Sequence, residues 1–352
     1  MNLPNQSPEY VAEVPSNIAL IKYWGKQNAE LQWPANDSLS MTLSHARSIT
    51  RVQINNEPCD LLVIDGRQAD QNSPQFKKPL QFLQKIRTIL EEEIDTSRHL
   101  SITSHNTFPQ SSGIASSASG IGALTLGAVA AWTGSPSFSV LSSRGFSQER
   151  LASLARLGSG SSCRSFGGGF VLWKAGKSPE DQETISLFSR EHWDLQDMIL
   201  IVSREPKLIS SSHGHDRAWT SPLFKNRLSE VPHRLQRLQD SIVYRDFALF
   251  GAIIEEDALE MHEVMKTSVP SLNYLLPITR EILQWILHKR ASSHFPAYFT
   301  LDAGPNIHLI CEKASLDRLV NEVKKENWPI EIIVDEIGSG PALSLSALKH
   351  QK

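Results

Sequence analysis

The spacing of apolar positions changes several times along the chain, and the changes predict a mixture of strands and helices. Residues 49–54 alternate apolar and polar side chains, as a half-buried strand does. Residues 79–93 carry their apolar side chains on one stripe, which predicts an amphipathic helix. By the same reasoning we expect strands at 61–66, 100–104, 170–173, 198–202, 297–301, 307–311 and 330–334, and helical stretches at 113–132, 222–258, 278–288 and 316–326.

This order of strands and helices is typical of an α+β sandwich. The 352 residues are enough for one large or two ordinary domains. The polar loop 175–181, followed soon by a buried strand, favours a domain change near residue 195. The sequence therefore predicts an N-terminal domain over 1–195 and a C-terminal domain over 196–352.

Composition and charge narrow the class of protein. The chain is 40% hydrophobic and 21% charged, with a net charge of −3, and its basic residues form only short clusters such as Lys77-Lys78. Such clusters are typical of solvated surface, so we expect no nucleic-acid partner. The three cysteines show neither a metal-ligand nor a disulfide spacing, and no apolar run reaches the ~20 residues of a membrane span. We expect a cytoplasmic, enzyme-sized protein with no membrane partner.

The first segment with chemical potential is 108–120, where small residues and serines lead from a strand into a helix. The free N–H groups and the positive dipole end of a helix N-terminus can hold polyphosphate. Gly113 would let the backbone approach such a ligand closely. A capped core helix of small residues explains the segment equally well. No Gly-Lys-Ser/Thr follows, so the segment is not a Walker loop.

The second segment, 17–26, places Lys22 and Lys26 four residues apart around an aromatic pair and a glycine. In an extended chain both lysines lie on one face, which suits paired phosphate-binding cations. Taken alone, the segment favours two surface lysines on a buried strand.

The third segment, 157–169, sets glycines and serines around Arg164. This pattern indicates an anion cradle with a guanidinium that can grip a carboxylate by two hydrogen bonds. The alternative is a flexible Gly/Ser linker, which the flanking apolar runs disfavour.

The fourth segment, 302–306, places Asp302 at the end of a strand, followed by a Gly-Pro turn. A carboxylate there could accept a proton from a substrate hydroxyl or orient it. By itself the segment favours an ordinary turn.

In this order the four segments resemble the GHMP family of small-molecule kinases and, within it, the diphosphomevalonate decarboxylases. The match runs from about residue 17 to 306. The Lys-Tyr-Trp-Gly-Lys and Gly-Ser-Gly-Ser…Cys-Arg-Ser segments are specific to the decarboxylase branch, whereas the serine-rich helix start is shared across the superfamily. The residues that carry the resemblance are Asn17-Ile18-Ala19, Lys22 to Lys26, Asn36, Ser38-Leu39-Ser40, Thr42-Leu43, Gly113 to Ala118, Gly158 to Ser161, Cys163-Arg164-Ser165, Ser210-Ser211 and Asp302 to Asn306.

The resemblance implies a two-domain GHMP kinase fold, with an N-terminal ribosomal-protein-S5-like domain and a C-terminal ferredoxin-like α/β sandwich. It implies ATP-dependent decarboxylation of mevalonate 5-diphosphate to isopentenyl diphosphate, with release of ADP, phosphate and CO2. ATP and Mg2+ are the implied cofactors, and a homodimer is the implied assembly.

The resemblance also implies roles residue by residue. Asp302 would activate or orient the C3 hydroxyl, Lys22 would stabilise the transferred phosphoryl group, Arg164 would hold the substrate carboxylate, and Ser159 would position the substrate. The implied diphosphate contacts are Tyr23, Lys26, Ser161 and Ser211. The implied nucleotide contacts are Ser104, Asn106, Gly113, Ala115, Ser116 and Ser117, with Ser117 also a candidate magnesium ligand.

The sequence departs from the family pattern at two places. Gln110-Ser111-Ser112 stands where Thr-Ala-Ala is usual, and Thr107 where Asn or His is common. After Ser211 come Ser212-His213-Gly214-His215, where bacterial relatives often carry an arginine and, after the glycine, a methionine. A further histidine, His262, matches a family histidine, but it is read here as a helix-face residue. The alternatives are a mevalonate monophosphate decarboxylase, a 3-kinase of the same family, and an inert ligand sensor.

Overall fold

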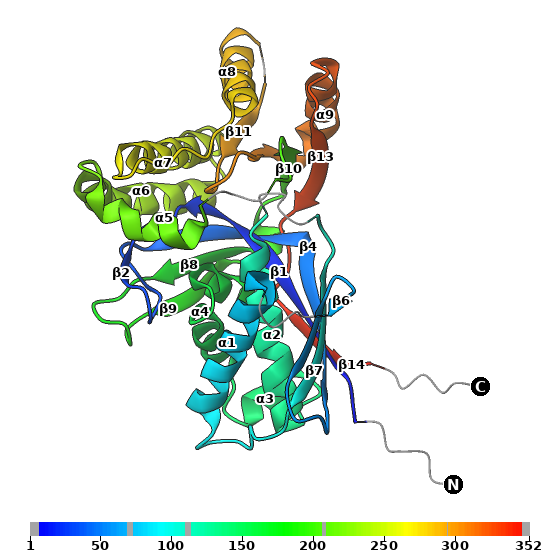
Figure 1. Cartoon of the computed structure of the whole chain (residues 1–352). Coiled ribbons are helices and arrows are strands. Elements are labelled where there is room, and N and C mark those ends of the chain that lie inside the picture. Colours follow the sequence, from blue (N-terminus) through cyan, green and yellow to red (C-terminus); the bar gives the residue numbers. More distant parts are fainter. Residues whose placement is uncertain (1–6, 69–72, 110–113, 206–208, 294, 347–352) are drawn as a thin grey trace.

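Two β-sheets with helices packed on them organise the chain in the computed structural model, which describes residues 7–68, 73–109, 114–205, 209–293 and 295–346 (Figure 1). The larger sheet has the strand order β14-β1-β4-β7-β5-β6, with β8 paired to β4 and β9 paired to β8. Its strands are β1 (Tyr10–Ile21), β4 (Ser38–Ile54), β5 (Leu61–Ile64), β6 (Arg67–Gln68), β7 (Leu100–Asn106), β8 (Phe170–Lys174), β9 (Glu183–Phe188) and β14 (Ala342–Leu345).

Helix α2 (Ser116–Thr133) packs along β1 and β4 and is buried over most of its length. Its small residues have a packing reason, because a Cβ atom on Gly122 would lie 2.8 Å from Val14 and one on Gly127 would lie 2.7 Å from Val52. Glycine is therefore needed where helix and sheet approach so closely. The same half of the molecule holds α1 (Pro74–Leu90), α3 (Phe138–Ser143), α4 (Gln148–Arg156) and the 3₁₀ helix η1 (Gly160–Phe166).

The smaller sheet is antiparallel, with the order β11-β12-β10-β13, and its helices lie at the top of Figure 1. Its strands are β10 (Leu195–Ile201), β11 (Ala297–Thr300), β12 (Ile307–Glu312) and β13 (Glu331–Glu336). The helices of this half are α5 (Ser211–Arg217), α6 (Phe224–Tyr244), α7 (Phe247–Thr267), α8 (Pro277–Ser292) and α9 (Leu316–Lys325). Two short strands, β2 (Lys26–Asn28) and β3 (Trp33–Pro34), form a separate hairpin.

Strand β1 carries residues of the site and is irregular where it does so. It pairs antiparallel with β4, and the register shifts between Pro15 and Asn17 and again between Ala19 and Ile21. Such irregularities re-aim side chains near functional sites. On its other edge β1 pairs with β14, Tyr10 lying opposite Leu345, so the last described strand joins the larger sheet.

Most predicted elements are present, and three expectations need correction. The helical stretch 222–258 is two helices, because Arg245 adopts a left-handed φ of 54° and Asp246 caps α7 by accepting a hydrogen bond from the Leu249 N–H. The helix predicted at 79–93 begins at Pro74 and ends at Leu90. The strand predicted at 49–54 is the last part of a 17-residue strand, β4.

Several elements were not predicted from the sequence: β1, β9, β14 and the short helices α3, α4 and α5. The domain change near residue 195 stays a prediction, and β10 begins there as the first strand of the smaller sheet. No helix among the described residues is long and apolar enough to cross a bilayer.

Candidate active site

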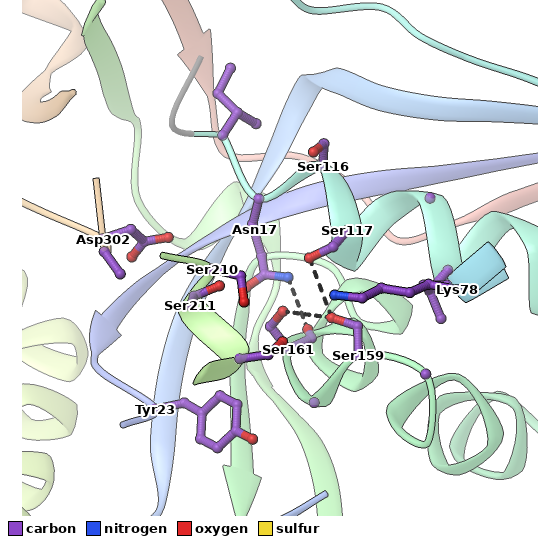
Figure 2. A pocket seen from close by; sticks show the side chains of 18 of the residues that line it. Asn17, Tyr23, Lys78, Ser116, Ser117, Ser159, Ser161, Ser210, Ser211 and Asp302 are labelled. Atoms are coloured by element: carbon purple, nitrogen blue, oxygen red, sulfur yellow. Dashed lines mark hydrogen bonds between the residues drawn. The ribbon is translucent and has the colours of Figure 1, made fainter. Parts of the chain in front are cut away.

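A cavity of about 750 Å³ brings the four sequence segments together (Figure 2). The end of β1, the start of α2, η1, α5 and the loop after β11 all contribute to its wall. Gly113 lies outside the described residues. The predicted site residues that line the cavity are Lys22, Tyr23, Lys26, Ser104, Asn106, Ala115, Ser116, Ser117, Ser159, Ser161, Arg164, Ser211 and Asp302.

An ion pair between Lys22 and Asp302 joins the two halves of the chain at the cavity wall. The Lys22 ammonium lies 2.9 Å from Asp302 Oδ1 and donates a second hydrogen bond of 2.6 Å to the Ala19 carbonyl. Lys22 is only 1% exposed, whereas the Asp302 side chain is 28% exposed. Burial lowers the pKa of Lys22, and the Asp302 charge acts in the opposite direction. The pair therefore presents a carboxylate to the cavity beside a buried cation.

The main chain of Lys22 is itself held by polar and charged side chains. Its N–H donates to Asp257 Oδ2 (2.7 Å), and its carbonyl accepts from Asn36 Nδ2 (3.0 Å) and Arg227 Nη2 (3.3 Å). Asp257 and Arg227 form an ion pair of 3.0 Å in which both side chains are fully buried. Arg234 on α6 also pairs with Asp257, at 3.1 Å. Helices α6 and α7 thus fix the position of Lys22 from behind the cavity.

A histidine on α7 holds the loop that carries Asp302. His262 Nε2 lies 3.1 Å from the Asp302 carbonyl oxygen, so this nitrogen carries the proton and donates. His262 is 8% exposed. It lies on α7 as a helix-face histidine would, and its contact makes it a buried positioning residue for the Asp302 loop.

Arg164 is a buried cation without a carboxylate partner among the described residues. It is 3% exposed, and its Nη1 donates to Ser38 Oγ at 2.7 Å. Its guanidinium lies 5.8 Å from the centre of the Trp173 ring, and its buried Nε has no hydrogen-bond partner in the described part of the chain. Burial lowers the pKa of Arg164, because it disfavours the charge. A buried guanidinium with an unsatisfied donor is stabilised most by a bound carboxylate, which supplies both the opposite charge and two acceptors. Segment 157–169 is therefore a built part of the site and not a flexible linker.

Several serine hydroxyl groups lie close together between η1 and the start of α2. Figure 2 shows Ser159 between Ser117 and Ser161, and its hydroxyl lies 3.4 Å from each of theirs. Asn17 donates to the Ser161 carbonyl (3.3 Å) and to Ser165 Oγ (2.8 Å), while its buried Oδ1 has no partner among the described residues. These serines and Asn17 present several donors and acceptors to one small volume.

The start of α2 and strand β7 form the opposite part of the wall. Ser104 Oγ lies 2.9 Å from Thr50 Oγ1, and the Asn106 side-chain oxygen accepts from Ser48 Oγ at 2.6 Å. Ser116 and Ser117 begin α2, so the positive dipole end of an 18-residue helix lies beside their hydroxyls, while the Ser116 and Ala118 N–H groups donate to the Ile114 and Ala115 carbonyls. This region offers hydrogen bonds and a helix dipole but no charged side chain of its own.

Tyr23 packs closely against η1 and α5. A Cβ atom on Gly160 would lie 2.8 Å from the Tyr23 ring, so η1 needs glycine there. The Tyr23 ring centre lies 4.8 Å from that of Trp173 and 4.2 Å from that of His215. Burial raises the pKa of Tyr23, and the phenol remains a neutral hydrogen-bonding group. Burial also lowers the pKa of Lys26.

Asn17 and Lys78 are among the cavity-lining residues to which the sequence assigned no role. Lys78 on α1 is exposed, as expected for a solvated lysine, and Figure 2 shows its ammonium group near Ser117 and Ser159. Its position on the helix was a signal, because Phe82 lies one turn later on the same face. The Phe82 ring packs so closely on Gly158 that a Cβ atom on Gly158 would lie 2.6 Å from it. Asn17 was signalled by its polarity within an apolar strand.

The chain was compared with known families and structures. The family profile for the diphosphomevalonate decarboxylase-like N-terminal domain matches residues 14–186, and that for the mevalonate 5-diphosphate decarboxylase C-terminal domain matches residues 197–344. The diphosphomevalonate decarboxylase of Candida albicans is 33% identical over 323 residues, which cover 88% of this chain and 86% of the relative.

Solved structures give the same result at the level of the fold. A complex of MDDEF with MVAPP, AMPPCP and magnesium has a TM-score of 0.86 at 31% identity and covers 96% of this chain and 99% of its own. Mevalonate diphosphate decarboxylase from Staphylococcus aureus has a TM-score of 0.85 at 29% identity, with 97% and 98% covered. The fold is that of the GHMP kinases, and the chain belongs to the diphosphomevalonate decarboxylase family.

Proposed function

We propose that the protein catalyses the ATP-dependent decarboxylation of mevalonate 5-diphosphate to isopentenyl diphosphate, with ADP, phosphate and CO2 as the other products. One observation carries the proposal. The Lys22–Asp302 pair, 2.9 Å apart, shares a cavity with the start of α2 and with Arg164, which forms no ion pair within the described part of the chain. These are the groups needed to hold a hydroxyl, a carboxylate and a polyphosphate at once.

The first step is phosphoryl transfer to the tertiary C3 hydroxyl. The hydroxyl oxygen forms a bond to the γ-phosphorus of ATP, the bond to the β-phosphate bridging oxygen breaks, and the hydroxyl proton leaves. A carboxylate held by an ammonium accepts a proton less readily than a free one, so Asp302 chiefly orients the hydroxyl and receives its proton late in the transfer. The Lys22 charge stabilises the negative charge that spreads over the transferred group.

The second step removes the new phosphate and the carboxylate. The C3–O bond breaks with its electron pair on phosphate, and C3 becomes cationic. The C1–C2 bond then breaks, its electrons form the C2=C3 alkene, and CO2 is released. Arg164 holds the substrate carboxylate, and Ser159 positions the substrate beside the hydroxyl.

The residues at the start of α2 fit ATP with Mg2+. The described residues contain no group of three carboxylates, histidines or cysteines that could hold a metal. Mg2+ commonly binds one or two protein groups together with substrate phosphates and waters, and here the exposed Ser117 hydroxyl is the protein group. When bound, the ion neutralises phosphate charge. Ser104 and Asn106 would contact the adenine, and Ala115 and Ser116 would contact the phosphates together with Gly113.

Tyr23, Lys26, Ser161 and Ser211 hold the substrate diphosphate. Lys26 supplies a cation, and the other three supply hydroxyl groups on the same cavity wall. The alternative substrate is mevalonate monophosphate, and a 3-kinase that stops after phosphoryl transfer is the alternative activity. An inert sensor of these ligands is the alternative outside catalysis.

Purified protein with Mg-ATP and either mevalonate phosphate or mevalonate diphosphate tests the proposal, with ADP and CO2 followed separately. We expect both products in equal amounts with the diphosphate. ADP without CO2 would identify a kinase, and faster turnover of the monophosphate would identify that decarboxylase. Neither product with either substrate, together with measurable binding, would identify a sensor. Light scattering tests the homodimer that we also propose, and fractionation of the source cells tests a cytoplasmic location.

A further inference from the structure

His215 is held rigidly at the cavity wall by aromatic rings. It lies on α5, is 7% exposed, and its ring centre lies 4.2 Å from that of Tyr23 and 4.6 Å from that of Trp24. The preceding residue must be small, because a Cβ atom on Gly214 would lie 2.5 Å from the Trp24 ring. A side chain packed in this way has one orientation, which a binding residue needs.

The hydrogen bonding of His215 fixes its tautomer. The Gly25 N–H donates to His215 Nδ1 at 3.0 Å, so Nδ1 carries no proton. Burial, and then the charges of Lys26 and Arg164, lower the pKa of His215 well below 6.5. The ring is therefore neutral near pH 7, and its proton lies on Nε2.

The Nε2–H group is the part of the ring left to bind a ligand. Two aromatic rings pack against the imidazole and Nδ1 is occupied, so Nε2 is the ring nitrogen left for a ligand in the cavity that His215 lines. No residue in the described part of the chain accepts a hydrogen bond from Nε2. The two charged side chains that act on the ring most strongly, Lys26 and Arg164, are both cations. A donor beside cations is complementary to an anionic oxygen.

We propose that His215 Nε2–H donates a hydrogen bond to a phosphate oxygen of the substrate, and so acts as a specificity residue. The inference rests on the proposed function. A neutral donor on a rigid ring adds a directional hydrogen bond to the anion contact for which Lys26 supplies the charge.

Two substitutions separate binding from packing. In His215→Gln the side-chain amide can place an N–H near the position of Nε2, but it loses the acceptor for Gly25. In His215→Asn the side-chain oxygen can accept from Gly25, but no donor reaches the position of Nε2. His213→Asn is the matched control, because His213 lies exposed on the same helix.

We expect His215→Asn to raise KM for the substrate about tenfold, since a hydrogen bond to a charged group is lost. The values of kcat and of KM for ATP should change less than threefold, His215→Gln should recover at least half of the loss in log KM, and His213→Asn should match the wild type. Thermal unfolding verifies that each variant folds. The proposal is overturned if His215→Asn behaves as wild type, if His215→Gln is the more damaged variant, or if the ATP KM rises instead.

Calorimetric binding of mevalonate diphosphate without ATP gives a second measurement that needs no turnover. A roughly tenfold weaker Kd in His215→Asn supports the proposal even if the wild type decarboxylates nothing. A wild type that binds without turnover would contradict only the proposed activity. An unchanged Kd in a folded His215→Asn variant would contradict the role of His215.

Discussion

The two walls of the cavity are built on different physical principles. The acceptor wall consists of Lys22, Arg164 and Asp302, and its two cations are almost fully buried. The nucleotide wall consists of Ser104, Asn106, Ser116 and Ser117, which are partly or fully exposed. The first wall presents charges fixed by protein contacts, and the second presents hydroxyls, an amide and the start of a helix, with the exposed Lys78 nearby.

This difference follows from what each ligand brings. The acceptor must be held in a single geometry in which a carboxylate, a hydroxyl and a phosphoryl group are aligned, and only rigid, desolvated charges achieve that. The nucleotide carries its own charge and its own metal, so many weak donors suffice. Removing a group from the acceptor wall should therefore reduce turnover, and removing one from the nucleotide wall should mainly weaken binding.

The largest effect is expected for Asp302→Asn. The amide cannot receive the hydroxyl proton, so kcat should fall by at least about 10³-fold while the Kd for ATP changes less than threefold. Single-turnover kinetics and nucleotide titration measure the two quantities. Loss of nucleotide binding in a folded variant would show that Asp302 is structural and would remove the contrast between the walls.

Asp257→Asn tests whether the acceptor wall depends on the charges behind it. The substitution leaves the buried Arg227 without its fully buried partner, so the free energy of unfolding should fall by about 3 kcal/mol. Glu256→Gln is the control, because Glu256 is half exposed and its loss from Arg234 should cost less than about 1 kcal/mol. Urea unfolding of both variants gives the comparison, and equal values would contradict it.

Arg164→Lys keeps the positive charge on the acceptor wall but removes the planar guanidinium group. We expect kcat/KM for the substrate to fall about 10²-fold, because an ammonium cannot hold a carboxylate by two parallel hydrogen bonds. KM for ATP should stay within threefold of wild type in the same steady-state assays. A selective rise in KM for ATP would place Arg164 on the nucleotide side.

Ser117→Ala tests the nucleotide wall. Loss of one hydroxyl should raise KM for Mg-ATP about three- to tenfold and leave KM for the substrate unchanged. Ser142→Ala, at an exposed position on α3, is the control and should have no effect. A large loss of kcat in Ser117→Ala would mean that this wall also positions the reacting groups.

The smallest effect is a shift in the alkaline limb of the pH profile. Burial lowers the pKa of Lys22 from its usual 10.5, so the ammonium is lost at a lower pH than in a free lysine. The value of kcat/KM should therefore begin to fall below pH 10.5 as the pH rises. In the activity that remains, Lys22→Arg should shift the alkaline limb to higher pH, because a guanidinium keeps its charge. An unmoved limb would assign it to another group, such as Lys26, whose pKa burial also lowers.

The sequence predicted the elements with strong periodicity and the four segments of the site, but not how they meet. β1 was missed because its burial on both faces removes the alternation that marks a strand. The break within the helical stretch 222–258 was not predicted. The chain turns at Arg245, where no glycine or proline signals a turn. The cavity position of Lys78 and the contact of His262 with the Asp302 carbonyl were missed, because both depend on neighbours distant in sequence.

By itself the sequence predicted most of the candidate site residues and their order, and through its resemblance it predicted the family and the reaction. Only the tertiary structure decided their electrostatic states. Lys22 forms an ion pair with Asp302, which lies 280 residues away in the sequence. Gly25 sets the tautomer of His215, which lies 190 residues away. Local propensity acts over a few residues, whereas burial and ion pairing depend on which distant side chains the fold brings together. The ordinary turn at 302–306 is a catalytic candidate because of those neighbours.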